Sequence, residues 1–186
     1  MKRLAPVLAL AALAGCGGGS KATTTTTTTT ASPPVPSALA AMRALVASQP
    51  ALAGKLTKLY EGGPWAVMES VEGAKAHAVV LRLVGNKWHE DRSRGVTITI
   101  LGPQPGATAR RIPQIAIGFK STGAPFIESA LWVDGNELVE KGGGTPTDGD
   151  IFGAPAAALK PGPHVAVGYA RSDKSGAAVA WVFTVK

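Results

Sequence analysis

Hydrophobic and polar residues alternate over several short segments in the second half of the chain. Val96, Ile98 and Ile100 are separated by threonines, a pattern typical of a strand with one buried face. Similar segments, separated by residues rich in Gly and Pro, predict further strands at 113–119, 131–133, 137–139, 165–169 and 177–185. Residues 141–149 lack the pattern and are expected to form a loop. Six or seven short strands at near-regular spacing predict an antiparallel β-sandwich over residues 95–186.

The segment that precedes these strands has the apolar spacing of a helix. Ser37 is a suitable N-cap, and apolar residues recur behind it at positions 39, 42, 45 and 46. Gln49-Pro50 should end this helix, because a residue before proline is disfavoured in the α region. Leu52, Leu56 and Leu59 predict another helical turn or two. The apolar stripe fits either membrane binding or packing on a sheet, and its short length and low charge favour packing.

Three strands are expected after this helix, at residues 65–71, 76–84 and 87–91, with turns at 72–74 and 85–86. The pattern predicts an antiparallel meander with the helix packed on it, over residues 37–94. The expected fold class is therefore mainly β, a small α+β module followed by an antiparallel sandwich.

The predicted sandwich also resembles the bacterial Ig-like domains of surface and secreted proteins. The resemblance rests on Gly-Pro-Gln-Pro-Gly at 102–106, Leu-Trp-Val-Asp-Gly at 131–135, Leu-Lys-Pro-Gly-Pro-His at 159–164 and Trp-Val-Phe-Thr-Val at 181–185. It implies that Asp134-Gly135 joins two neighbouring strands and that Trp181 and Phe183 pack between the sheets. It covers residues 95–186 and implies a fold but no particular ligand.

The N-terminus has the layout of a secretory signal. Met1-Lys2-Arg3 is basic, an apolar run extends to Leu13, and this run is too short to span a bilayer as a helix. The run leads through Ala14 and Gly15 into Cys16, the one cysteine of 186 residues. Leu13-Ala14-Gly15-Cys16 resembles the lipobox of bacterial lipoproteins. The resemblance implies a signal peptide at residues 1–15, cleavage between Gly15 and Cys16, and a diacylglyceryl thioether on Cys16, with acyl chains such as palmitate. The expected location is the extracytoplasmic side of the cell membrane.

A low-complexity tether is expected at residues 16–36. It contains Gly17-Gly18-Gly19, eight consecutive threonines from Thr23 to Thr30 and a Pro-rich end. No apolar periodicity offsets the entropy of ordering it. The threonine run is also a candidate acceptor for O-linked sugars.

Charge is unevenly distributed along the chain. The formal net charge is +7, and basic residues outnumber acidic ones between positions 22 and 111. This fits either a solvated basic surface or a surface that faces anionic lipids or wall polymers. Nucleic acid is not an expected partner, because the chain is predicted to be exported, has few aromatic residues and carries no recognisable nucleic-acid-binding motif. No disulfide can form within the fold, and no cofactor is expected.

Candidate metal ligands are sparse. His89-Glu90-Asp91 lacks the second histidine that a helical zinc motif requires, and His77 and His164 are distant in sequence. Asp148 and Asp150, helped by Asp134, are weak calcium candidates, because a lone Asp-x-Asp more often forms a polar turn.

No catalytic set is visible either. The chain has no Gly-x-Ser-x-Gly elbow, and Ser121 and Ser129 have no base nearby in sequence. Its tryptophans fit a sugar-stacking platform less well than a core: Trp65, Trp88, Trp132 and Trp181. The sequence therefore predicts a non-catalytic binding, adhesion or structural module of the cell envelope, held on the membrane by its lipid, with another envelope protein or an anionic wall polymer as partner. The alternative is an enzyme, or an accessory subunit of one, that acts on wall polymer or exported protein. An enzyme would require a cleft with converging polar side chains, such as one lined by His89, Glu90 and a basic residue.

Overall fold

The computed structural model describes residues 34–142 and 147–186, and residues 34–186 group into one compact unit. The predicted signal peptide with Gly15 and Cys16, and the tether up to residue 33, lie outside the described residues. Within the described ranges no helix is long and apolar enough to cross a bilayer.

Helix α1 (Ala38–Ser48) forms where the sequence predicted it. The Ser37 hydroxyl accepts a hydrogen bond from the backbone N–H of Ala40 at 3.2 Å, and this caps the first turn. Ala38 and Met42 are fully buried in a cluster with residues of the neighbouring sheet. The apolar stripe of α1 therefore packs on a sheet, as its low charge indicated.

The prediction of further helical turns after Pro50 is wrong. A short 3₁₀ turn, η1 (Pro50–Leu52), is followed by the strand β1 (Lys55–Gly62). Gly54 separates them at φ 130°, a backbone conformation that interrupts a helix. The pairing of β1 shifts between Lys58 and Tyr60, and this irregularity hid the alternation of a strand.

The expected meander is confirmed and gains β1 as a fourth strand. It continues with β2 (Trp65–Glu72), β3 (Lys75–Val84) and β4 (Lys87–Glu90), all antiparallel in the order β1-β2-β3-β4. We call this sheet the N-terminal sheet. Alternate residues of β2 face opposite layers, because Ala66 and Met68 pack with α1 whereas Trp65 and Val67 pack with the second module.

The second module is an antiparallel Ig-like β-sandwich, as predicted. Its smaller sheet has the order β10-β7-β5, formed by β5 (Val96–Gly102), β7 (Ile115–Ser121) and β10 (Asp148–Gly153). Its larger sheet, the central sheet, has the order β6-β12-β11-β8-β9, formed by β6 (Thr108–Ala109), β8 (Phe126–Val133), β9 (Asn136–Gly142), β11 (Gly162–Ser172) and β12 (Gly176–Val185). Among the strand pairs of the described residues, only the short β6–β12 pair is parallel.

The loop expected at residues 141–149 is shorter than predicted. β9 extends to Gly142, and β10 begins at Asp148 and pairs with β7. Asp and Gly are depleted in strands, so this segment had a turn composition. Only Ile151 of β10 is fully buried, which left too few apolar positions to show an alternation.

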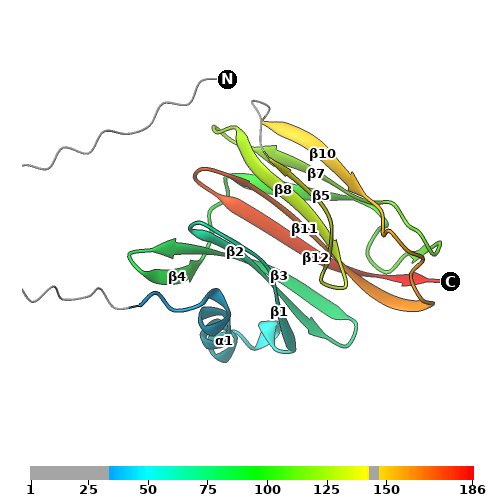
Figure 1. Cartoon of the computed structure of the whole chain (residues 1–186), viewed down its shortest axis with the longest axis horizontal. Coiled ribbons are helices and arrows are strands. Elements are labelled where there is room, and N and C mark those ends of the chain that lie inside the picture. Colours follow the sequence, from blue (N-terminus) through cyan, green and yellow to red (C-terminus); the bar gives the residue numbers. More distant parts are fainter. Residues whose placement is uncertain (1–33, 143–146) are drawn as a thin grey trace, which may run out of the picture. The chain divides into compact units, whose positions relative to one another are not determined.

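The central sheet is buried on both faces (Figure 1). One face packs on β5, β7 and β10 around Ile117, Trp181 and Phe183, which confirms the expected place of the last two residues. The opposite face packs on the N-terminal sheet around Trp65, Trp132, Val167 and Tyr169. The layers are therefore α1, the N-terminal sheet, the central sheet and the smaller sheet.

Candidate functional site

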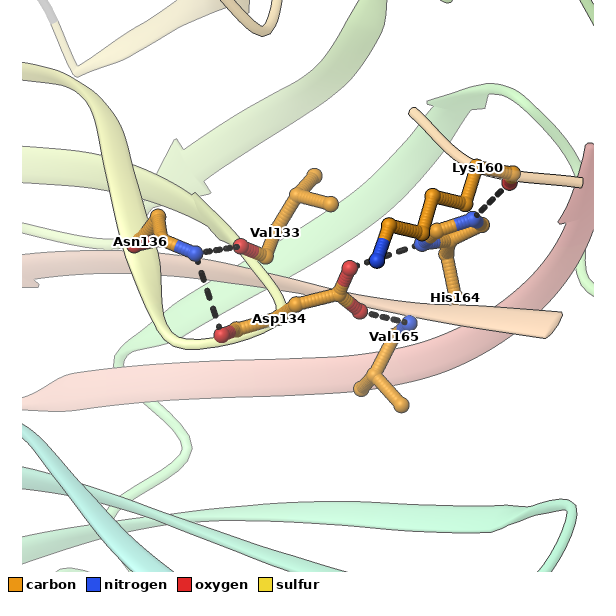
Figure 2. Close-up of polar contacts among 6 residues, drawn as sticks. All are labelled: Val133, Asp134, Asn136, Lys160, His164 and Val165. Carbon is orange, nitrogen blue, oxygen red and sulfur yellow. Dashed lines mark hydrogen bonds and ion pairs between the residues drawn. The ribbon is translucent and has the colours of Figure 1, made fainter. Parts of the chain in front are cut away.

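The structure brings Asp134 and His164 together, although they are thirty positions apart in sequence. Asp134 lies in the tight turn between β8 and β9 at φ 50°, where the sequence predicted a turn, and His164 lies near the start of β11. The Asp134 Oδ2 atom is 2.7 Å from His164 Nδ1 (Figure 2). The backbone N–H of Val165 donates a hydrogen bond to Asp134 Oδ1 at 3.0 Å. In return, the backbone N–H of Asp134 donates to the carbonyl oxygen of Val165 at 2.9 Å.

The geometry around His164 favours its imidazolium form. Its Nε2 atom lies 2.7 Å from the carbonyl oxygen of Lys160, so both ring nitrogens face acceptors and both must donate. Burial acts to lower the pKa of His164, but hydrogen bonds to Asp134 and to the Lys160 carbonyl, with the Asp134 charge, raise it overall. The ring is nine-tenths buried and stacks on Phe183 at a centroid distance of 5.8 Å.

A small pocket adjoins the other side of Asp134. It has a volume of about 190 Å³ and lies between the N-terminal sheet and the central sheet. We call it the Glu69 pocket; its lining residues are Lys55, Thr57, Glu69, Val71, Asp134 and Val165. The four residues from β1 and β2 share one face of their sheet, because Lys55 pairs with Val71 and Thr57 pairs with Glu69.

Glu69 is the unusual member of this pocket. Only 3% of the residue is exposed, and its Oε1 atom has no hydrogen-bond partner among the described residues. Burial, and next the negative charge of Asp134, raise the pKa of Glu69, while Lys55 acts in the opposite direction. A buried carboxyl group without a partner is costly, so its retention here calls for a physical reason.

The weak calcium candidates do not form one cluster. Asp148 and Asp150 are exposed residues of β10, where they pair with Lys120 and Gly118 of β7, whereas the Asp134 carboxylate is engaged by His164 and Val165. In residues 34–142 and 147–186 no group of three or more His, Cys, Asp or Glu side chains is arranged to hold a metal ion.

A cleft lined by His89, Glu90 and a basic residue is present beside α1. It has a volume of about 420 Å³ and also contacts Ala44, Trp88 and Arg92. The Glu90 carboxylate is 2.8 Å from Arg92 Nη2 and accepts a hydrogen bond from Gln49 Nε2 at 3.1 Å. His89 is exposed on β4 and has no hydrogen bond to Glu90. The cleft has the composition that the enzyme alternative required, but its carboxylate is neutralised by Arg92 and its histidine is not oriented by an acid.

A buried ion pair that sequence reasoning missed lies at the opposite end of the same interface. Arg171 Nε lies 2.6 Å from Glu128 Oε2, with 16% and 7% of the two side chains exposed. The pair neighbours Tyr60, whose pKa is raised to about 12 by burial and then by Glu128. Trp65 lies beside Arg171 and beneath Arg82, whose guanidinium is 5.1 Å from the ring centroid.

Three of the four tryptophans are core residues, as the sequence favoured. Trp65, Trp132 and Trp181 are each no more than 3% exposed. Trp88 is half-buried at the edge of the helix cluster, and its indole N–H donates to the carbonyl of Pro36 at 2.8 Å. The tryptophans are therefore not arranged as an exposed stacking platform.

No family model and no curated protein matches this chain. Several solved structures are similar to part of it, including these three. The CARDB domain of a Pyrococcus furiosus protein has 7% identity and a TM-score of 0.37, and the match covers 49% of this chain and 94% of that one. Fibronectin(III)-like modules of Clostridium thermocellum CbhA have 17% identity and a TM-score of 0.35, with 48% of this chain and 96% of that one covered. A lytic polysaccharide monooxygenase of Jonesia denitrificans has 14% identity and a TM-score of 0.33, with 45% of this chain and 60% of that one covered. At this level of similarity they carry no information on function, and the strand order itself defines the sandwich.

Proposed function

We propose that this protein is a lipid-anchored module of the bacterial cell envelope that binds a partner without catalysing a reaction. The observation that carries the proposal is the combination, in one chain, of the lipobox Leu13-Ala14-Gly15-Cys16, a Thr- and Pro-rich segment, and a compact β-rich unit that begins near residue 37. In this reading Cys16 is the first mature residue and its acyl chains hold it in the membrane. The intervening segment then gives the folded unit reach from the lipid surface.

The non-catalytic assignment is supported by how the polar groups are used. Both ring nitrogens of His164 are engaged by internal acceptors, so the ring has no free nitrogen to act as a base. The acid of the cleft beside α1 is paired with Arg92. The partner proposed here is another envelope protein or an anionic wall polymer, which the excess of basic residues in the first half of the chain would attract.

The anchor is tested by replacing its proposed acceptor. Cys16→Ser should move the protein from the detergent phase to the aqueous phase in phase partitioning and abolish incorporation of labelled fatty acid. Ser20→Ala is the matched control and should behave as the parent protein. Membrane fractionation of Cys16→Ser identical to that of the parent would refute the anchor.

The binding role is tested separately by crosslinking in intact cells. A lysine-reactive crosslinker should reproducibly join the parent protein to the same envelope component, because many lysines of the folded unit are exposed. The failure of repeated experiments to yield any constant partner would count against a binding module while leaving the anchor result unaffected.

The cleft beside α1 favours the enzyme alternative as a second candidate. His89 lines it together with Glu90 and Arg92, as an acid–base site would require. If the cleft is catalytic, His89→Ala should abolish hydrolysis of wall fragments or exported peptides by the purified protein, whereas His77→Ala should not. The non-catalytic proposal expects no turnover from the parent protein on either substrate class.

A further inference from the structure

The Glu69 pocket contains an arrangement of charges that the proposed function does not use. Glu69 lies on β2 with 97% of its surface buried, in a layer that otherwise contributes Trp65 and Val67 to an apolar cluster. Its Oε1 atom faces no donor in the described part of the chain. A carboxyl group buried in this way is satisfied only by a donor that enters from outside.

A second carboxylate lines the same pocket from the central sheet. Asp134 is fixed there by His164 and by the Val165 N–H, its negative charge acts on Glu69, and its carboxylate retains acceptor capacity. Thr57 pairs directly with Glu69 across β1 and β2, so its hydroxyl is a third acceptor on the same face. An ammonium group, with three N–H donors, matches three oxygen acceptors of this kind better than a hard metal ion, which takes about six to eight ligands.

Lys55 adds a charge of the opposite sign. It is exposed, and it pairs with Val71 one step along the sheet from the Thr57–Glu69 pair. A ligand with only a positive charge would be opposed by Lys55, whereas a ligand that also carries a carboxylate would bind it. The pocket volume of about 190 Å³ is below the range of about 300–1,000 Å³ typical of drug-sized ligands. This size fits a small molecule of a few non-hydrogen atoms.

We propose that the Glu69 pocket binds a small zwitterion of amino-acid size, with its ammonium group between Glu69 and Asp134 and its carboxylate on Lys55. The Thr57 hydroxyl completes the ammonium site. The wall formed by Val71 and Val165 accommodates a short apolar side chain. The lining residues of this pocket do not include residues 13–16, so its test does not depend on the anchor.

Titration of the full chain by NMR, with L-alanine as the probe, tests the proposal. L-Alanine should cause saturable shifts of the Thr57, Glu69 and Gly135 amide signals. Ethylammonium and acetate, which each carry one of the two charges, should bind at least tenfold more weakly. Equal affinity for ethylammonium and L-alanine would overturn the zwitterion assignment, and no saturable shift with any of the three would overturn the site.

Variants of Glu69 and Lys55 test which residue binds the ammonium group and which binds the carboxylate of the ligand. Glu69→Gln and Lys55→Gln should each weaken L-alanine binding at least tenfold. Glu72→Gln, an exposed position on the same strand, is the matched control and should bind as the parent does. A parent-like circular dichroism spectrum and a cooperative thermal unfolding transition would establish that each variant is folded. Binding by folded Glu69→Gln at the parent's affinity would contradict the proposal.

Discussion

The two faces of the central sheet bury different chemistry. The face that packs on β5, β7 and β10 buries apolar side chains such as Ile117, Leu131 and Phe183. The face that packs on the N-terminal sheet has an apolar middle around Trp132 and Tyr169, but it has the Glu128–Arg171 pair at one end and the Glu69 pocket at the other. Because Glu128 lies near the start of β8 and Asp134 directly follows its last residue, one strand positions a residue at each polar end.

This difference separates stability from specificity. An apolar interface gains free energy in proportion to the area that it removes from water. Buried charges contribute less, because their desolvation offsets much of their attraction, but they are strongly destabilising when one partner is lost. We therefore expect the smaller sheet to be the main source of stability for the sandwich, and the N-terminal sheet to create the polar sites.

The largest effect is expected from the apolar face. Phe183→Ala should lower the free energy of unfolding by about 3–5 kcal/mol, because it leaves a cavity in the most tightly buried cluster. Val182→Ala, a half-buried neighbour on the opposite face of β12, should cost only about 1 kcal/mol. Urea unfolding monitored by tryptophan fluorescence measures both, and equal losses would remove the proposed difference between the faces.

The charged face should respond next. Glu128→Ala leaves Arg171 buried without its partner and should cost about 2–4 kcal/mol, somewhat below the cost in a fully desolvated pair. The double variant Glu128→Leu/Arg171→Met should recover most of this loss, since it replaces two charges with apolar groups. A double variant as unstable as Glu128→Ala would instead show that the ion pair itself stabilises the interface.

Replacement of Glu69, the other buried acid of this interface, should stabilise the fold instead of destabilising it. Since the pKa of Glu69 is raised, its ionisation opposes folding, and its favourable contribution is lost as pH rises through the folded-state pKa. Glu69→Gln should therefore increase the free energy of unfolding by about 1 kcal/mol at pH 8 and by less at pH 5. Destabilisation at pH 8 would mean that the ionised carboxylate has a stabilising partner.

The smallest effect is the pH dependence contributed by His164. Its pKa is raised above the ordinary 6.5, so its contribution to stability is complete below that pH and is lost as pH rises through the folded-state value. His164→Gln in a Glu69→Gln background isolates this effect from the titration of Glu69. Urea midpoints of the two proteins between pH 6 and 9 should converge as pH rises, and a constant gap would show that His164 acts only through packing.

Strands with a clear apolar alternation or a run of apolar residues were predictable from the sequence, whereas β1 and β10 were not. Val96, Ile98 and Ile100 alternate with exposed threonines, so their strand was evident. Over β1 the sequence favours a helix, because Leu52, Leu56 and Leu59 also fit a helical period and a register shift at Tyr60 breaks the alternation. Over β10 the sequence favours a loop, because its Asp and Gly residues have turn composition.

The candidate site was only partly visible in the sequence. Asp134 stood out through its Asp-Gly turn and His164 through its place before a strand, but the pairing of the two depends on the β8–β11 register. Glu69 gave no signal, because a glutamate within a strand is ordinarily solvent-exposed. Its burial follows from the contact between the N-terminal sheet and the central sheet, which lies beyond local periodicity.

Mass spectrometry of the mature protein extracted from membranes tests the central claim most directly. The proposed anchor predicts an N-terminal peptide that begins at Cys16 and carries the mass of a diacylglyceryl group with its acyl chains. Intact precursor that retains residues 1–15, is unmodified at Cys16 and is soluble in the cytosol would contradict the account.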